Sequence, residues 1–453
     1  MKKIFTLIVA CIATLATTAQ TEGTTVSNAW GLTGEGTEAN PYCIYTADDL
    51  YAMAKNCNAD HKGTGEFFVL KNDIDFGGSA ETPMQQPAIG KDGNAKITTI
   101  AYGFDGTFDG AGHTISGIYH TETSNDAKGK YNGLFACIDK NGVVKNLIIS
   151  KDNHITGYNY VGTIASLNMG LIQNCTNYAD VTAANFAAGG VCGFFVNGTG
   201  IVKDCQNFGN VKAMTYASGI CGGSQSGKSV VTYSYLIEHC TNKGDLSTTN
   251  GVGSAGIAGS YSGAVKDCTN YGITDDTHGT SKSRQYTAGI VACASYAVDI
   301  DGCKNYGTVN GVKNVGGIVG NVMKGDAAAT VIKNCVNDAA VNGQDAYVAG
   351  IVANSARDEG VVSVANCTNN GEVTTTATTE YIGNLRGNSK IALGEGNIIA
   401  AGLKTYKLDP ETSTAIKGLE QNNAVVKNGK YLKNGRIVIF NNGNQYNING
   451  TRL

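Results

Sequence analysis

The sequence contains little proline and arginine, and its charges are few and nearly balanced. Four of the 453 residues are proline, and none lies between Ala88 and Asp409. This composition excludes collagen and flexible proline-rich linkers. Five arginines and a formal net charge of −3, or −5 without Lys2 and Lys3, provide no basic surface for nucleic acid. Beyond the first 19 residues, no stretch approaches the roughly 18 apolar residues that a membrane helix needs.

The N-terminus has the plan of a secretory signal peptide. Residues 1–19 combine two lysines with an apolar run and end in small residues, which predicts cleavage between Ala19 and Gln20. The run from Ile8 to Cys11 loosely matches a lipoprotein box, so lipidation at Cys11 is the alternative. We therefore expect an exported protein that is extracellular or lies on the outer cell surface, without a transmembrane segment.

Glycine is abundant, with 61 residues, and accompanies many asparagine, threonine and valine residues, a composition typical of short strands joined by tight turns. A small-residue and apolar element, which reads Gly-Ile-Val-Gly in its clearest copy, recurs along the chain. Its copies begin at Gly133, Gly162, Gly190, Gly219, Gly256, Gly289, Gly317, Gly350 and Gly383. Eight steps cover the 250 residues from Gly133 to Gly383, a mean of about 31 residues per repeat.

A second element, Cys-x-Asn, follows the first in each repeat. Its seven copies are Cys175 and Asn177, Cys205 and Asn207, Cys240 and Asn242, Cys268 and Asn270, Cys303 and Asn305, Cys335 and Asn337, and Cys367 and Asn369. No unit contains a segment of helical period, so neighbouring units must stack and share one core. We predict an all-β, right-handed parallel β-helix over residues 101–395, preceded by a cap and first strands over residues 20–100. In it the asparagines form a hydrogen-bonded ladder and the cysteines are buried thiols.

The repeat pattern is similar to one found in a known group of proteins. Gly-Gly-Ile-Val-Gly, followed by Ile-x-Asn-Cys-x-Asn-x-Gly-x-Val, resembles the GLUG-type repeat of bacterial surface proteins. Residues 70–76 and 104–118 resemble the coils that usually precede such repeats. The resemblance covers residues 43–385. It implies a β-helix and surface exposure, and it implies no catalytic residues.

Residues 46–57 form the one segment with a convincing helical pattern. Thr46 and Asp49 approximate a capping box. The apolar face consists of Leu50, Met53 and Ala54. We expect this helix to close the N-terminal end of the stack, which needs a cap against edge-to-edge aggregation. Cys43 and Cys57 flank the helix and are the best candidates for a disulfide.

Residues 396–453 lose the repeat and end in an alternating segment. Asn434-Gly435 and Asn442-Gly443 predict turns and therefore a small C-terminal β-hairpin module. The segments at 435–439 and 446–450 are similar to type IX secretion sorting domains of Bacteroidetes, which implies export by that route. A hairpin that only caps the far end of the β-helix is the alternative.

Groups that would carry catalysis lie in turn-like contexts. Asp105 and Asp109 have glycine neighbours, and Asp in such turns bonds the local backbone. Asp73 and Asp75 have the same interpretation, with a calcium site as the alternative. The sequence offers no close cysteine pair of the kind that binds metal. We expect no metal, no cofactor and no catalytic residue.

The repeat lengthens at two places, where the steps from Gly219 and Gly256 are 37 and 33 residues. Insertions in solenoids form loops on one face, often the binding face. The candidate ligand-binding residues in these insertions are Tyr233, Tyr235, Tyr286, Asp275 and Asp276, with the tyrosines placed to stack on sugar rings.

These observations favour a non-catalytic surface or secreted protein. We expect it to act in adhesion, in glycan or partner binding, or as a cell-envelope spacer. The alternative is a polysaccharide lyase or glycoside hydrolase on a β-helix scaffold. Glycoside cleavage needs two carboxylates at a fixed separation, which the adjacent Asp275 and Asp276 would not hold in a flexible loop.

Overall fold

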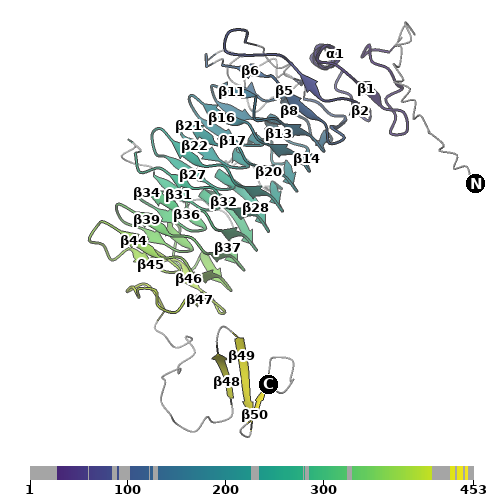
Figure 1. Cartoon of the computed structure of the whole chain (residues 1–453). Coiled ribbons are helices and arrows are strands. Elements are labelled where there is room, and N and C mark those ends of the chain that lie inside the picture. The colour runs from purple at the N-terminus through teal and green to yellow at the C-terminus, as the bar shows by residue number, and fades with distance from the viewer. Residues whose placement is uncertain are drawn as a thin grey trace, which may run out of the picture.

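The described residues form an all-β parallel solenoid with one short helix near the N-terminal end (Figure 1). The computed structural model describes residues 28–59, 61–83, 89–90, 103–121, 123–125, 131–225, 234–278, 280, 285–323, 329–410, 429–433, 436–441 and 444–446. The predicted signal peptide and Cys11 lie outside the described residues.

Four parallel sheets run along the solenoid. Sheet 1 is the largest, because several coils contribute two strands to it: β1 (Tyr42–Ile44), β2 (Phe67–Leu70), β4 (Thr107–Asp109), β8 (Phe135–Ile138), β9 (Val143–Lys145), β13 (Ala165–Asn168), β14 (Leu171–Gln173), β18 (Cys192–Phe195), β19 (Ile201–Lys203), β23 (Cys221–Gly223), β24 (Leu236–Glu238), β28 (Ala258–Lys266), β32 (Val291–Asp301), β36 (Val319–Val322), β37 (Thr330–Lys333), β41 (Val352–Ser355), β42 (Val362–Ala365) and β46 (Ala392–Leu393). Sheet 2 contains β3 (Ile74–Asp75), β5 (Thr114–Ser116), β10 (Ile148–Ile149), β15 (Thr176–Asn177), β20 (Gln206–Asn207), β25 (Thr241–Asn242), β29 (Thr269–Asn270), β33 (Lys304–Asn305), β38 (Val336–Asn337), β43 (Thr368–Asn369) and β47 (Ile398–Ile399).

The other two parallel sheets have nine strands each. Sheet 3 contains β6 (Tyr119–His120), β11 (His154–Gly157), β16 (Asp180–Ala183), β21 (Val211–Ala213), β26 (Leu246–Thr248), β30 (Thr274–Asp275), β34 (Val309–Gly311), β39 (Val341–Gly343) and β44 (Val373–Thr375). Sheet 4 contains β7 (Tyr131–Asn132), β12 (Tyr160–Gly162), β17 (Ala187–Gly189), β22 (Tyr216–Ser218), β27 (Gly253–Ala255), β31 (Tyr286–Ala288), β35 (Val315–Gly316), β40 (Val348–Ala349) and β45 (Ile382–Gly383).

The asparagine of each Cys-x-Asn element lies in register with that of the next coil, on the inner side of sheet 2. The seven asparagines from Asn177 to Asn369 are fully buried. In all six steps, the side-chain Nδ2 donates to Oδ1 of the following asparagine over 2.7–2.9 Å. Each Nδ2 also donates to the carbonyl oxygen two residues later, as Asn305 does to Gly307. The predicted amide ladder is confirmed.

The two sequence elements of the repeat meet in one structural contact. A Cβ atom on Gly219 would lie 2.2 Å from Cγ of Asn242 and 2.3 Å from the carbonyl oxygen of Gly256. Gly289 stands in the same relation to Asn305, with its Cβ position 2.2 Å from Cγ. Only glycine fits against the buried amide, so the glycine column and the asparagine ladder require each other.

A tight corner precedes each cysteine and turns the chain from sheet 1 into sheet 2. Gly302 precedes Cys303 with φ 67°, and the other corner residues adopt the left-handed conformation with φ between 50° and 56°. They are Asn146, which precedes Leu147, and Asn174, Asp204, His239, Asp267, Asn334 and Asn366, which precede cysteines. Asn, Asp and His are the non-glycine residues that tolerate this conformation best. We call these seven residues the corner column.

The seven repeat cysteines are buried free thiols, as predicted. They lie in the main core just inside the corner column. Cys43 and Cys57 are also free, so the predicted disulfide between them is wrong. Cys57 is buried in the core, whereas the Cys43 thiol donates to the carbonyl oxygen of Pro41 at 3.5 Å.

Thiol accessibility provides a test of this core. In native protein, we expect Ellman's reagent to label Cys43 fastest among the described cysteines, because it alone is partly exposed. Burial also raises the pKa of the Cys57 thiol to about 12, which suppresses the reactive thiolate. Denaturant should release the remaining thiols, and Cys43→Ser should remove the fast phase. Five or more disulfides in a mass spectrum would contradict the buried-thiol column.

The N-terminal helix α1 (Ala47–Cys57) has the expected cap. Thr46 accepts from the backbone N–H of Asp49 at 3.3 Å, and the Asp49 carboxylate accepts from the backbone N–H of Thr46 at 3.0 Å. The buried residues of the helix are Leu50, Met53, Ala54 and Cys57. The predicted helix, capping box and apolar face are confirmed.

The C-terminal end of the amide ladder meets a carboxylate. Asn369 donates to Oδ1 of Asn384 at 3.2 Å, and Asn384 donates to Oδ2 of Asp409 at 2.8 Å. Because every amide of the ladder donates in the same direction, its last N–H group faces a negative charge. This arrangement is favourable for the same reason that anions are favourable at helix N-termini, where N–H groups also point outward.

Three antiparallel strands follow, β48 (Gly429–Lys433), β49 (Arg436–Asn441) and β50 (Asn444–Tyr446). Lys433 pairs with Arg436 and Asn441 with Asn444, so the strands flank the two predicted turns. The predicted hairpins are confirmed. The sorting role and the domain boundaries stay predictions.

Candidate ligand-binding surface

The first insertion does not present an exposed tyrosine in its described part. Tyr233 lies outside the described residues. Tyr235 is 1% exposed, stacks on Phe195 with ring centroids 5.5 Å apart, and its hydroxyl accepts from the backbone N–H of Gly198 at 2.8 Å. The expected exposed position of Tyr235 is therefore wrong, because the ring fills the core of the neighbouring coil.

The second insertion begins and ends within regular strands. Asp275 ends β30, and its Oδ1 accepts from the backbone N–H and the hydroxyl of Thr277, which closes a local turn. Tyr286 begins β31, pairs with Gly253 of the preceding coil and is buried. The expectation of a flexible loop at Asp275 and Tyr286 is wrong, because both residues belong to strands that pair with the neighbouring coils.

Asp276 is a buried carboxylate that joins three strands, β26, β27 and β31. Its Oδ1 accepts from the backbone N–H and hydroxyl of Thr248 at 2.8 and 2.7 Å. Its Oδ2 accepts from the backbone N–H and hydroxyl of Ser254 at 2.9 and 2.7 Å, and from the hydroxyl of Thr287 at 3.1 Å. Burial raises the pKa of Asp276 above its ordinary value, although these hydrogen bonds oppose the rise. Its contacts are structural, and the side chain is not open to a ligand.

The structure instead shows an exposed column that the sequence analysis missed. It lies directly after the asparagine ladder and consists of Tyr178, Phe208, Lys243, Tyr271 and Tyr306, which we call the aromatic–lysine ladder. The backbone N–H groups of the last four each donate to the asparagine carbonyl of the preceding coil over 2.7–2.8 Å. These bonds place the five side chains at equivalent positions on successive coils.

The side chains of the aromatic–lysine ladder contact one another along the solenoid. Tyr178 and Phe208 stack with centroids 4.7 Å apart at 18°, and Nζ of Lys243 lies 4.8 Å from the centre of the Phe208 ring. Tyr271 and Tyr306 stack at 5.0 Å and 10°. The three tyrosines remain 44%, 51% and 41% exposed. Stacking holds the rings in place, so their edges and hydroxyl groups form an ordered outer surface.

A second column of polar side chains lies beside this ladder. Its residues come two places before each ladder residue, on the same face of the chain by strand alternation. They are Thr176, Gln206, Thr241, Thr269 and Lys304. In the described part of the chain, no side-chain hydrogen bond engages these five groups. The two columns together form what we call the ladder face.

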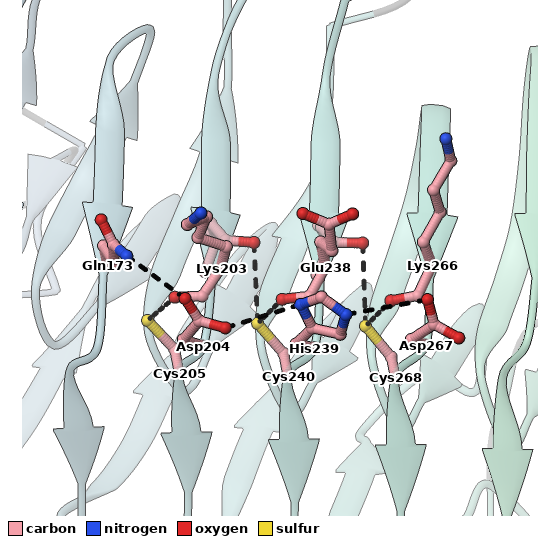
Figure 2. A network of polar contacts seen from close by, with 12 residues as sticks. Gln173, Lys203, Asp204, Cys205, Glu238, His239, Cys240, Lys266, Asp267 and Cys268 are labelled. Atoms are coloured by element: carbon pink, nitrogen blue, oxygen red, sulfur yellow. Dashed lines mark hydrogen bonds and ion pairs between the residues drawn. The ribbon is translucent and has the colours of Figure 1, made fainter.

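The opposite border of sheet 2 is the corner column, in which polar side chains of successive coils contact one another (Figure 2). His239 lies between Asp204 and Asp267, with Nδ1 3.6 Å from Asp204 Oδ1 and Nε2 3.8 Å from Asp267 Oδ2. Gln173 donates to Oδ2 of Asp204 at 3.2 Å. The preceding strands pair Lys203 with Glu238 and Glu238 with Lys266, so opposite charges alternate from coil to coil.

Sequence reasoning could have found the aromatic–lysine ladder from one signal. In four of the seven Cys-x-Asn copies, an aromatic residue follows the asparagine directly. The four are Tyr178, Phe208, Tyr271 and Tyr306. A search for apolar periodicity assigns aromatic residues to a core, and only the inward asparagine places the next side chain outside.

Among the described residues, no group of three or more His, Cys, Asp or Glu side chains could hold a metal ion. The described helix is too short to cross a membrane. Asp105 Oδ1 accepts from the backbone N–H of Asn141 at 3.0 Å, and Asp109 Oδ1 accepts from the backbone N–H of Ala111 at 2.8 Å. Both carboxylates therefore stabilise the local backbone.

Comparisons with known proteins give partial likenesses. The chain matches no family model. It is 31% identical over 157 residues to halomucin of Haloquadratum walsbyi, which is 35% of this chain and 2% of that protein. It is 35% identical over 144 residues to a provisionally named Gly-rich membrane protein of Evansella cellulosilytica, 31% of this chain and 15% of that protein. The chain therefore spans a small part of these curated relatives.

Among solved structures, the chain resembles a provisionally assigned immunoglobulin A1 protease from Bacteroides ovatus. The likeness has 20% sequence identity and a TM-score of 0.43, and it covers 61% of this chain and 77% of the other. Membership of the GLUG-type group, origin in Bacteroidetes and a type IX sorting domain stay predictions.

Proposed function

We propose that this protein is exported and works at the outer cell surface or beyond it, as a non-catalytic solenoid that acts in adhesion by binding a glycan or a partner. The ladder face is its binding surface. The pattern of residues 1–19 supports export. One similar protein is named a membrane protein, which agrees with a location at the cell envelope.

The observation that carries this proposal is the exposed aromatic–lysine ladder on a rigid sheet. Exposed tyrosines offer an apolar ring edge and a hydroxyl, a combination suited to sugar rings. Because stacking and strand pairing already order the rings, little conformational entropy is lost on binding. Repetition from coil to coil lets an extended ligand make the same weak contact several times.

The enzyme alternative draws no support from the two adjacent carboxylates in the second insertion. Asp276 is engaged by five donors inside the solenoid, and Asp275 bonds Thr277 at a turn. The two groups therefore do not face a common space where a glycosidic bond could lie between them.

A glycan array combined with a reducing-sugar assay tests the proposal. We expect glycan binding without release of reducing ends, and about ten-fold weaker binding when Tyr271 and Tyr306 are both replaced by alanine, since each aromatic contact contributes about 0.5–1.5 kcal/mol. Tyr45→Ala is the matched control, because this exposed tyrosine lies in the N-terminal cap, before the helix. Turnover of a polysaccharide, or unchanged binding in the double variant, would contradict the proposal.

A further inference from the structure

Two lysines give the ladder face a positive charge that the described chain does not neutralise. Five other described lysines reach a carboxylate, as Lys62 reaches Asp139 at 3.0 Å and Lys145 reaches Asp109 at 3.4 Å. Within the described residues, Lys243 and Lys304 take part in no ion pair. Nζ of Lys243 lies instead over the Phe208 ring.

We propose that the ladder face binds an acidic polysaccharide that lies along the solenoid axis, with its anionic groups at Lys243 and Lys304. This inference rests on the binding function proposed above. The ammonium groups would each meet a carboxylate or a sulfate of the sugar chain. Tyr271 and Tyr306 would contact the sugar rings beside these groups, and the free Thr269 hydroxyl would bond the ring hydroxyls.

The spacing of the coils suits such a ligand. Neighbouring coils of a parallel β-solenoid are about 4.8 Å apart, which is close to the advance of one pyranose ring along an extended polysaccharide. Lys243 follows β25 and Lys304 begins β33, so one coil, that of β29, lies between them. The two charges are thus two coil steps apart along the axis. A polysaccharide with an acidic group on every second sugar repeats its charge over the same number of rings.

Carboxylates mark the limits of the ladder face. Asp338 continues the column after Tyr306, and its Oδ1 accepts from Asn370. Asp245 lies two residues beyond Lys243, and its Oδ1 accepts from the backbone N–H of Ile273 at 2.9 Å. These groups disfavour an anionic chain away from the two lysines, so charge confines it to the ladder.

Binding measurements on the full chain test this inference. The probes are polygalacturonate, dextran sulfate and uncharged dextran, which separate carboxylate, sulfate and neutral ligands. We expect binding of at least one acidic polymer that weakens at least ten-fold between about 50 and 200 mM NaCl, because exposed ion pairs are screened. Lys243→Gln with Lys304→Gln should weaken it about ten-fold more at low salt. Lys212→Gln, an exposed lysine of sheet 3, should change it less than two-fold.

The outcomes separate this inference from the function on which it rests. The protein could instead bind a neutral glycan in a salt-insensitive manner, with weaker binding in the Tyr271→Ala, Tyr306→Ala double variant. This result would overturn the acidic ligand and keep the binding function. If Lys212→Gln weakens binding of the acidic polymer as much as the double lysine variant does, the effect of charge is diffuse. This result would overturn the proposed site. Binding of no polysaccharide, acidic or neutral, would overturn the acidic ligand and also the glycan-binding form of the proposed function, which would leave only binding of a partner. Circular dichroism of each variant confirms that the solenoid is intact.

Discussion

Asn305→Ala is expected to lower the free energy of unfolding by about 3–6 kcal/mol. Asn305 accepts from Asn270 at 2.9 Å, donates to Asn337 at 2.8 Å and donates to the carbonyl of Gly307 at 2.9 Å. Alanine leaves these three buried groups without their partner, and each unsatisfied buried group costs about 1–3 kcal/mol. Water cannot replace the amide readily, because Gly289 packs directly against it.

Urea unfolding followed by circular dichroism measures this loss. Asn342→Ala is the matched control, since Asn342 also belongs to an amide contact between coils but lies on the outer face of sheet 3. It donates to Asn310 at 2.9 Å and is partly exposed, so water satisfies the groups that alanine frees. We expect the control to cost below about 1 kcal/mol. Equal losses in the two variants would show that the buried ladder contributes no more than a surface contact.

Much of the fold could be predicted because a solenoid converts sequence period into spatial contact. Residues one repeat apart become neighbours, so the Cys-x-Asn copies align without knowledge of any other contact. The α1 helix was also readable, since its capping box and apolar face are local. The contact between Gly219 and Asn242 was not readable, because it joins two elements across the interior rather than along one column.

The candidate site was harder to predict, because outward positions of a solenoid carry no packing constraint. The aromatic–lysine ladder breaks at Lys243, so it does not read as a pure aromatic repeat. The prediction of exposed binding loops at the two insertions was wrong because packing constrains these residues. Their polar composition indicates loops, yet Thr248 and Ser254 of the preceding coil provide buried donors for Asp276. Such compensation comes from residues distant in sequence and leaves no local signal.

Asp276→Ala is the second substitution with a large expected effect on stability. It removes the acceptor of two backbone N–H groups, at Thr248 and Ser254, and of three hydroxyls. Two orphaned backbone donors alone cost about 2–6 kcal/mol. Asp275→Ala, the adjacent control, should cost below about 1 kcal/mol, because its partners are local and reach water. Urea titration of each single variant, followed by circular dichroism, measures the two losses.

The protonation of Asp276 adds a pH dependence with a defined sign. Because burial raises its pKa above 3.8, the folded chain retains this proton over a pH range in which the unfolded chain has released it. The stability contributed by the carboxyl is thus fully present below pH 3.8 and declines as pH rises through the folded pKa. Asp276→Asn keeps the shape but cannot titrate. The difference in unfolding free energy between the natural chain and Asp276→Asn should therefore shrink as pH rises above 3.8 and through the folded pKa. A difference that grows with pH would mean that the five donors hold Asp276 as a carboxylate, with its pKa lowered instead.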